Sequence, residues 1–188
     1  TCGQKICAFI EHYCLIPEGA QVGQPIKLIK FQRKFILDVF DNPHGTSRAY
    51  LSVARKNGKS ALIAAILLTH LVGPEARQNS QIISGARSRD QASLVFKLAK
   101  KWSDCRLIIK DCADRTLVED AGGLICNVEF KAISAESGTA HGLSPVLAIL
   151  DELGQVRGPH DAFIEAIETA LRNMAAKLDN IEQALRKK

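Results

Sequence analysis

The stretch that most constrains the fold of this chain is Ser52–Ser60, which reads SVARKNGKS. An apolar run at residues 49–53 leads into it, and a run with helical character at residues 61–68 follows it. A strand, a tight turn and a helix in this order are typical of a phosphate-binding loop, because a helix N-terminus offers backbone N–H groups and the positive end of a dipole. The stretch therefore predicts an α/β fold with an anion site at the start of a helix.

Three residues of the loop have specific expected roles. Gly58 lets the backbone approach a phosphate closely, Lys59 reaches the β- and γ-phosphates, and the Ser60 hydroxyl binds Mg²⁺. The complete motif also has a glycine where this chain has Val53, and a bare Gly-Lys-Ser tripeptide occurs by chance in solvated loops. The flanking strand and helix favour the phosphate loop, and the helix is expected to end at Gly73-Pro74.

A second motif, Pro145–Glu152, joins an unbroken apolar run to two adjacent carboxylates. The run predicts a buried central strand, and its C-terminal end is where open α/β sheets bind ligands. Asp151 is expected to hold Mg²⁺ through water, and Glu152 to act as the general base for the water that attacks the γ-phosphate. Acidic pairs after strands also cap helices, so this interpretation depends on the phosphate loop upstream.

The chain between the two motifs predicts one short buried strand at residues 81–84, a helix that ends near Trp102, and several short strands within residues 106–133. Arg87 and Arg89, at the turn between that strand and that helix, are candidates for contact with DNA phosphates or with the nucleotide of a neighbouring subunit. His141, in a loop of small polar residues, is a candidate sensor of nucleotide or DNA. Surface charge and hydrogen bonding within a loop are the commoner roles of such residues.

Two helical segments are expected before the loop, at residues 6–16 and 26–37, with a break at Pro17. The apolar residues of the second segment fall on one face, at Leu28, Phe31, Phe35 and Val39. Gln32 and Arg33 lie beside this face. A glutamine ahead of the phosphate loop pairs with adenine in several nucleotide motors, since its amide both donates and accepts hydrogen bonds. A solvated Gln32 on a surface helix is the alternative, and spacing alone favours it.

Composition narrows the possible partners and compartments. The 188 residues suit one domain with a sizeable core, and no apolar run reaches the roughly 20 residues of a membrane span. The first residues do not resemble a secretory signal, and a start at Thr1 suggests a trimmed chain. More than half of the net charge of +5 lies in residues 171–188, so overall charge argues only weakly for nucleic acid.

The six cysteines show no Cys-x-x-Cys pair and no accompanying histidine spacing, so a zinc site is not expected. A nucleotide enzyme without a signal peptide points to a reducing cytosol. We therefore expect six free thiols, most of them small buried side chains.

A long helix is predicted from about residue 161 to the chain end. Its apolar residues repeat at spacings of three and four, at Ile164, Ile167, Leu171, Met174, Leu178, Ile181 and Leu185. Such a stripe either packs on the domain that carries it or forms a coiled-coil seam with another helix. The two alternatives are equally well supported by the pattern.

Five elements of the chain, taken in order, resemble the ATPase domain of the large terminase subunit of tailed bacteriophages. They are Phe31–Arg33, Ser52–Ser60, Ser84–Gln91, Ser134–Gly142 and Leu147–Glu152, within a resemblance over about residues 6–170. The resemblance implies a P-loop NTPase of the additional-strand, catalytic-glutamate type, with a mainly parallel central sheet flanked by helices. The family's loop characteristically lacks the first glycine, which accounts for Val53.

The resemblance also implies roles for individual residues. Arg55 stands where the family has a basic residue, so it is expected to stabilise γ-phosphate charge and to be catalytic together with Lys59 and Glu152. Gln32 becomes an expected adenine contact. The implied nucleotide-binding residues are Gln32, Arg55, Lys56, Asn57, Gly58, Lys59 and Ser60, and the implied Mg²⁺ residues are Ser60 and Asp151.

The function implied by the resemblance is ATP-driven packaging of double-stranded DNA into a procapsid. The implied assembly is a homo-oligomeric ring docked on the portal protein, which works with a small terminase subunit in the host cytoplasm, with no membrane partner. Residues 1–170 would form the ATPase domain, with the helical segment 6–40 packed on it. Residues 171–188 would form a helical tail.

The chain departs from the family pattern after the Asp151-Glu152 pair. The family's coupling motif and metal-dependent nuclease domain do not follow, so nuclease activity is not expected, and a truncated or fused chain would explain the break. Two other functions remain open: a helicase-like DNA-dependent ATPase, and a nucleotide-binding assembly module without efficient turnover.

Overall fold

The computed structural model describes residues 1–17, 19–54, 57–77, 79–86, 92–95, 97–99, 122–125, 128–134 and 145–151, and residues 165, 167–169, 171–173 and 176 of the C-terminal segment. These residues belong to two compact units. The first unit comprises Thr1–Arg77 and Val95–Arg115, and the second comprises Gln78–Leu94 and Thr116–Lys188.

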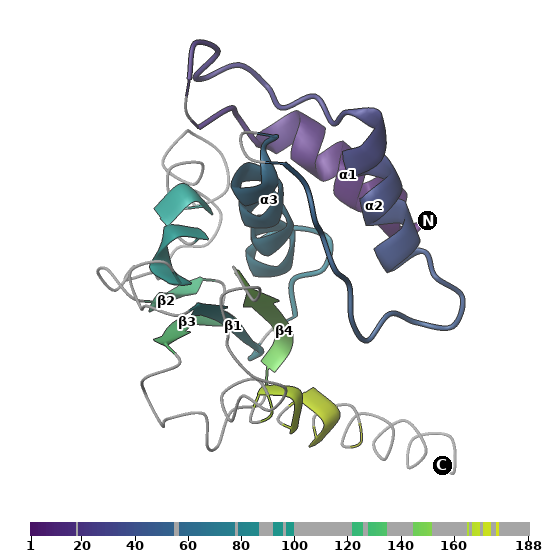
Figure 1. Cartoon of the computed structure of the whole chain (residues 1–188), viewed down its shortest axis with the longest axis vertical. Coiled ribbons are helices and arrows are strands. Elements are labelled where there is room, and N and C mark those ends of the chain that lie inside the picture. Colours follow the sequence, from purple (N-terminus) through teal and green to yellow (C-terminus); the bar gives the residue numbers. More distant parts are fainter. Residues whose placement is uncertain are drawn as a thin grey trace. The chain divides into compact units, whose positions relative to one another are not determined.

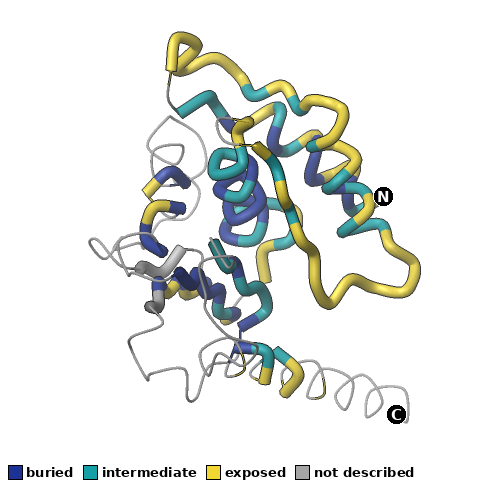
Figure 2. Tube along the Cα trace, in the orientation of Figure 1, coloured by how far each residue is buried: buried dark blue, intermediate teal, exposed yellow. Residues whose placement is uncertain are grey.

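The first unit contains α1 at Cys2–Tyr13, α2 at Lys30–Phe40 and α3 at Lys59–Leu71 (Figure 1). α1 packs against both α2 and α3 and buries Ile6, Cys7 and Ile10 along one face, as an amphipathic helix does. α3 is buried around most of its circumference, and Figure 2 shows it as mostly dark blue. The apolar run after the candidate phosphate loop therefore forms the most buried of these three helices.

The start of α1 is tied to the end of α2 through Asp41. The Thr1 side chain accepts a hydrogen bond from the Gln4 N–H, which caps α1. Asp41 in turn accepts from the Gly3 N–H at 2.7 Å and from the Thr1 hydroxyl at 2.6 Å. These two hydrogen bonds, first the one from Thr1, lower the pKa of the Asp41 carboxyl.

Both helical segments expected at the N-terminus exist, with boundaries that differ from the prediction. α1 ends at Tyr13 because Cys14 is extended and Leu15 pairs with Pro25 in an isolated antiparallel bridge. α2 begins only at Lys30, so the residues 26–29 form an extended loop rather than its first turn.

The predicted inner face of α2 is confirmed only in part, since Phe35 and Val39 are half-buried but Phe31 is not. Ile36 is the buried residue of this helix, whereas Phe31 is 38% exposed. A helix that starts four residues later than expected packs on α1 through a different stripe, and Gln32 is one helical turn before Ile36 on that stripe.

The second unit holds a four-stranded sheet of β1 at Gln81–Ala86, β2 at Gly122–Ile125, β3 at Val128–Ser134 and β4 at Pro145–Leu150. The strand order is β2-β3-β1-β4 (Figure 1). β1 pairs in parallel with β3 and with β4, and β2 pairs antiparallel with β3. The expected mainly parallel sheet is therefore present.

The interior strands of the described sheet are β1 and β3, whereas the Pro145–Leu150 run was predicted to be a central strand. β1 is buried from Ile82 to Ala86 because it has a neighbour on each side. β4 has a described neighbour on one side only, and its residues 146–148 are half-buried. An apolar run alone does not distinguish a central strand from an edge strand.

No strand forms at residues 49–53, where one was expected before the phosphate loop. This segment is neither helix nor strand, and Tyr50 is 76% exposed. A strand needs a neighbour to take up its backbone hydrogen bonds, and none of the described strands pairs with these residues.

Part of the C-terminal stripe packs on the sheet of its own unit. Ile167 and Ile83 are fully buried against each other, and Ala148, Leu150 and Leu171 surround them. This contact agrees with a helix that lies on the domain that carries it. The stripe residues that lie outside the described part of the chain are Ile164, Met174, Leu178, Ile181 and Leu185.

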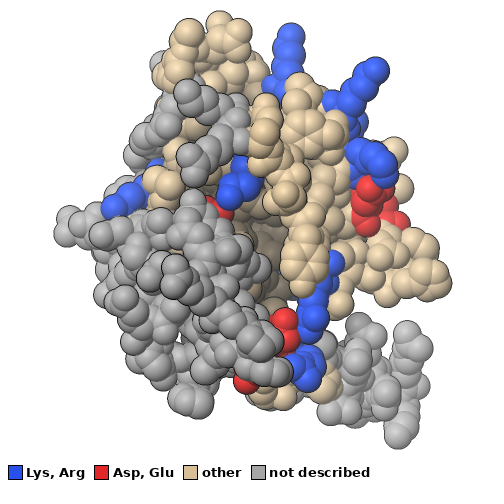
Figure 3. Space-filling view, in the orientation of Figure 1, with Lys and Arg blue, Asp and Glu red and all other residues tan. Residues whose placement is uncertain are grey.

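Several basic side chains on the surface are engaged with acidic ones. In the first unit Arg33 pairs with Glu11 at 2.7 Å and Lys34 with Asp38 at 2.6 Å. Figure 3 shows blue side chains beside red ones on the face it displays. Among the described residues, no helix combines the length and the apolar character that a membrane span requires.

Candidate functional site: a pocket beside the phosphate loop

Gly58 marks the junction between the loop and α3. It is the residue before the helix, and its φ of 72° and ψ of 19° are left-handed. This conformation is one that glycine adopts without the steric cost of a Cβ. The Leu62 N–H donates to the Gly58 carbonyl at 2.9 Å, which is the first bond of the helix. Lys59 and Ser60 therefore form the first turn of α3, at the positive end of its dipole.

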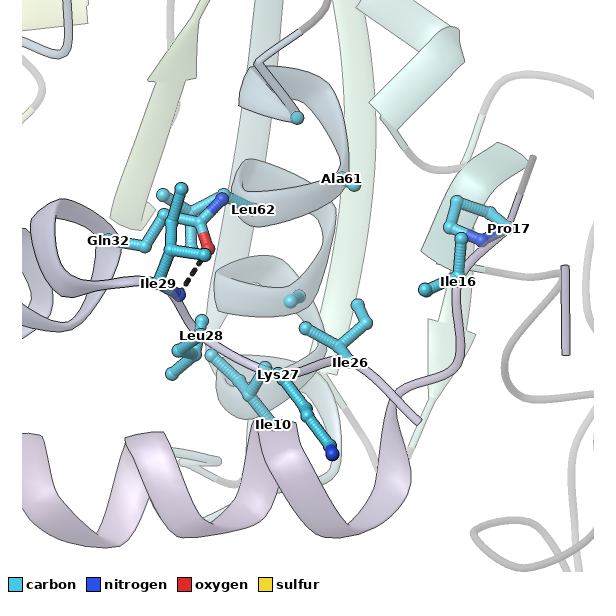
Figure 4. Close-up of a pocket in the computed structure, with 12 residues that line it drawn as sticks. Ile10, Ile16, Pro17, Ile26, Lys27, Leu28, Ile29, Gln32, Ala61 and Leu62 are labelled. Carbon is cyan, nitrogen blue, oxygen red and sulfur yellow. Dashed lines mark hydrogen bonds between the residues drawn. The ribbon is translucent and has the colours of Figure 1, made fainter. Parts of the chain in front are cut away.

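Gln32 reaches from α2 to this junction (Figure 4). Its Oε1 accepts a hydrogen bond from the Ile29 N–H at 3.2 Å. Its Nε2 lies 3.4 Å from the position that a Cβ on Gly58 would occupy. The amide therefore spans the distance between the loop before α2 and the loop before α3, and it is half-buried rather than solvated.

A pocket of about 220 Å³ opens beside this amide. Its walls come from the loop at residues 26–29 and from the first two turns of α3, with Ile10 and Pro17 also in contact (Figure 4). Almost all of the lining is aliphatic, and Gln32 and Lys27 supply the polar side chains. Pockets for drug-sized ligands are larger, at roughly 300–1,000 Å³. A mostly apolar pocket of this size with an amide in its lining has room for a single ring system rather than a drug-sized molecule.

The loop at residues 26–29, which forms one wall of the pocket, is neither helix nor strand. Hydrogen bonds from neighbouring elements hold it in place. Glu11 of α1 accepts from the Leu28 N–H at 3.2 Å and from the Arg33 guanidinium at 2.7 Å. The Ile26 N–H donates to the Cys14 carbonyl at 2.9 Å. Arg33, which the sequence places next to the candidate base contact, thus holds the pocket wall through Glu11, and this ion pair raises the pKa of Arg33.

Asp151 follows β4 directly in the second unit. Its N–H donates to the Gly85 carbonyl at 3.0 Å, so the pairing of β4 with β1 continues one residue beyond the strand. Its carboxylate is therefore at the C-terminal ends of two parallel strands, where ligands bind in sheets of this type. Nearby on β1, the Ser84 hydroxyl is fully buried and has no hydrogen-bond partner among the described residues.

The predicted site residues are distributed between the two units and the undescribed chain. The structure brings Gln32 and Gly58 together and places Asn57, Lys59 and Ser60 at the same junction. Asp151 belongs to the second unit. The candidates outside the described residues are Arg55, Lys56, Arg87, Arg89, His141 and Glu152.

Sequence reasoning did not anticipate the contributions of Glu11 and Ile29. Glu11 acts on a loop 17 residues away, and nothing in its sequence context signals this. Ile29 contributes through its backbone N–H, which donates to Gln32. Every residue except proline carries such a group. Knowledge of where α2 begins would have revealed it, because a side chain three residues into a helix can accept from the residue before the helix.

The described cysteines are free thiols, namely Cys2, Cys7 and Cys14. Burial raises the pKa of Cys14 to about 12. Burial, together with a hydrogen bond to Glu75 at 2.9 Å, raises the pKa of Cys2 to about 11. These thiols are protonated at neutral pH and are poor nucleophiles. The other cysteines, Cys105, Cys112 and Cys126, lie outside the described residues.

Known proteins are similar to this chain in sequence and in fold. Residues 30–182 match the family described as "Terminase large subunit, ATPase domain". The chain is 58% identical over 171 residues to the protein named "Terminase, large subunit" of Enterobacteria phage HK97, which covers 90% of this chain and 34% of that protein. A crystal structure of the HK97 bacteriophage large terminase superposes with a TM-score of 0.79 and 56% identity, over 91% of this chain and 35% of that one. The chain thus spans about a third of the length of these relatives.

Proposed function

Since the chain belongs to the family of terminase large-subunit ATPase domains, we propose that it hydrolyses ATP and that this hydrolysis drives double-stranded DNA into a procapsid. The proposed catalytic domain covers residues 1–170, with residues 171–188 as a helical tail. Nuclease activity is not part of the proposal.

The observation that carries the proposal is the junction of Gln32 with Gly58. The pocket that Gln32 borders has the size and apolar lining for a nucleobase. Gly58, the last residue before α3, lines this pocket. Lys59 and Ser60 follow it as the first residues of α3. A base site that adjoins an anion-favouring helix N-terminus is the arrangement that a nucleoside triphosphate requires.

We assign the roles as follows. Gln32 pairs with adenine, while the backbone at Asn57 and Gly58 surrounds the phosphates. Lys59 and Arg55 stabilise the charge that develops on the γ-phosphoryl group, and Lys56 contributes to phosphate binding. Glu152 takes the proton from the attacking water. The bond to the γ-phosphorus forms from that water as the bond to the β-γ bridging oxygen breaks, which yields ADP and inorganic phosphate.

Mg²⁺ is the metal that this donor set suits. A serine hydroxyl and an aspartate carboxylate, from Ser60 and Asp151, are hard oxygen ligands of the kind that Mg²⁺ prefers, and it keeps waters for its other positions. The ion would neutralise negative charge on the β- and γ-phosphates. Ser60 lies in the first turn of α3 in the first unit, and Asp151 follows β4 in the second.

The larger assembly is also part of the proposal. We expect a homo-oligomeric ring on the portal protein, with the small terminase subunit as a second partner, in the host cytoplasm and without a membrane. Arg87, Arg89 and His141 are the proposed contacts with DNA or with a neighbouring subunit. Arg33 and Lys34 are each paired with an acid, which reduces the positive charge that they offer to DNA.

A hydrolysis assay with one matched control tests the proposal. Phosphate release should be measured with and without double-stranded DNA for the parent chain, Lys59→Ala and Lys34→Ala. Lys34 is on α2, 75% exposed at its side chain and paired with Asp38. The Lys59 variant should lose activity by about 100-fold or more, and the Lys34 variant should retain it. Equal activity in all three would refute the phosphate-loop assignment, whereas ATP binding without turnover in the parent would favour an assembly module.

A further inference from the structure

We infer that the main-chain N–H of Ile29 is a positioning group for base recognition, because it fixes which end of the Gln32 amide faces the pocket. This inference rests on the proposed nucleotide site and adds to it the origin of its base selectivity. The ligand class concerned is a purine nucleotide that offers an acceptor nitrogen, such as N7 of adenine, to the Gln32 NH₂ group.

The chemistry of the two partners determines the amide orientation. A backbone N–H can only donate, so the glutamine atom 3.2 Å from Ile29 must be the oxygen. The NH₂ group is then directed away from Ile29 and towards Gly58 and α3 (Figure 4). A rotation of the amide by half a turn would place two donors opposite each other at Ile29 and would lose this hydrogen bond.

This fixed orientation presents a distinct pattern to a bound base. The NH₂ group offers a donor, and Oε1 retains one lone pair beside the one that Ile29 occupies. The matching base edge has an acceptor and a donor side by side, which is the N7 and N6–H₂ edge of adenine. Guanine has two acceptors on that edge, so it would set its O6 against Oε1.

The backbone at Ile29 allows the N–H to be removed with little distortion. The φ of Ile29 is −76°, which is close to the value that proline imposes. The residue stands immediately before α2, where the helix itself needs no N–H from it. Ile29→Pro therefore deletes the donor, and Ile29→Val serves as the control that retains it.

The test compares three probes on the full chain by calorimetry. ATP carries N7, 7-deaza-ATP has a carbon in its place, and tripolyphosphate has no base. Ile29→Pro should weaken ATP binding by about 2- to 10-fold, the range expected for one hydrogen bond. It should change 7-deaza-ATP binding by less than about twofold, and tripolyphosphate binding not at all. Ile29→Val should match the parent chain.

Equal losses for ATP and 7-deaza-ATP in Ile29→Pro would overturn the inference, because the N–H would then only shape the pocket.

Gln32→Glu provides a second test that does not depend on proline. Its carboxylate still accepts from Ile29 but presents an oxygen to the pocket, so the preference for ATP over 7-deaza-ATP should vanish, and a retained preference would contradict us. If the parent binds neither ATP nor tripolyphosphate, the proposed function fails. If it binds both but does not distinguish 7-deaza-ATP from ATP, only this inference fails.

Discussion

The Nε2 atom of Gln32 lies 3.4 Å from the point at which Gly58 would carry a Cβ. The Gln32 side chain therefore lies next to Gly58, although the two residues are 26 positions apart in the sequence. Gln32 lies in the first turn of α2, and Gly58 stands immediately before α3. This contact joins the candidate base pocket to the candidate phosphate loop, and its removal or displacement has measurable consequences.

Gly58→Ala should reduce both stability and nucleotide affinity. Alanine in the left-handed region costs about 1–2 kcal/mol, and its methyl group would occupy the space 3.4 Å from Gln32 Nε2, beside the candidate base contact. Gly45→Ala is the matched control, since Gly45 has the same φ of 72° and nothing within 4 Å of its added Cβ. Urea unfolding should show similar losses for both variants, but only Gly58→Ala should weaken ATP binding. If the two variants bind ATP equally well, the Gln32 contact is not relevant to the ligand.

Glu11→Ala should weaken ATP binding although Glu11 does not line the pocket. The variant frees the Leu28 N–H and the Arg33 guanidinium together, so the loop at residues 26–29 loses one of its supports. We expect a loss of about 2- to 10-fold, in line with the loss of hydrogen bonds to one carboxylate. Asp38→Ala removes another exposed helix carboxylate with a basic partner and should leave ATP affinity unchanged. Equal affinities for both variants would show that this support is not needed.

Stability should fall as the pH drops below about 6.5 because of His70. Burial lowers the pKa of His70, whose Nδ1 lies 2.9 Å from the Ile66 carbonyl. The unfolded chain, with a histidine pKa near 6.5, then binds more protons than the folded chain between the two pKa values. Folding is therefore disfavoured progressively as the pH falls through this window, and the full penalty is reached below the folded pKa.

Thermal melts at pH 7.5 and 5.5 measure this effect. His70→Leu should show a smaller decrease in Tm between the two pH values than the parent chain. Substitution of the exposed His44 by Gln should leave the decrease as it is in the parent. An unchanged decrease in His70→Leu would assign the pH dependence to other groups.

Ile167→Ala should destabilise the second unit by about 2–5 kcal/mol, the usual range for truncation of a fully buried isoleucine. Its partners are Ile83 of β1 and Leu171 of its own helix. Arg172→Ala, at a side chain that is 72% exposed, should change stability by less than about 0.5 kcal/mol. Chemical unfolding at two protein concentrations measures both. A loss for Ile167→Ala that depends on protein concentration would instead indicate a seam between chains.

The sequence predicted the features that depend on local chemistry. The loop and the helix at Lys59 follow from a glycine that adopts a left-handed conformation before an uninterrupted apolar run. The parallel strands at Gln81–Ala86 and Pro145–Leu150 follow from short apolar runs. Helical spacing predicted that Ile167 and Leu171 lie on one apolar face, and both pack in the same cluster.

The features that depend on long-range partners were not predictable in the same way. Which apolar strand is central depends on the number of its neighbours, so the run at Pro145–Leu150, expected to be central, lies at the end of the described strand order. The inward face of α2 depends on the helix start at Lys30, which is set by a hydrogen bond from Ile29 to Gln32. Gln32 therefore looked like a surface residue in the pattern but borders the pocket in the fold.

Photolabelling with 8-azido-ATP is the most direct test of the central claim, which is that a nucleobase occupies the slot between the residue 26–29 loop and the start of α3. After irradiation and proteolysis, the labelled peptides should contain residues 26–32 or 58–65, and excess ATP should abolish the labelling. Labelling confined to other segments, or labelling that ATP does not prevent, would contradict the account.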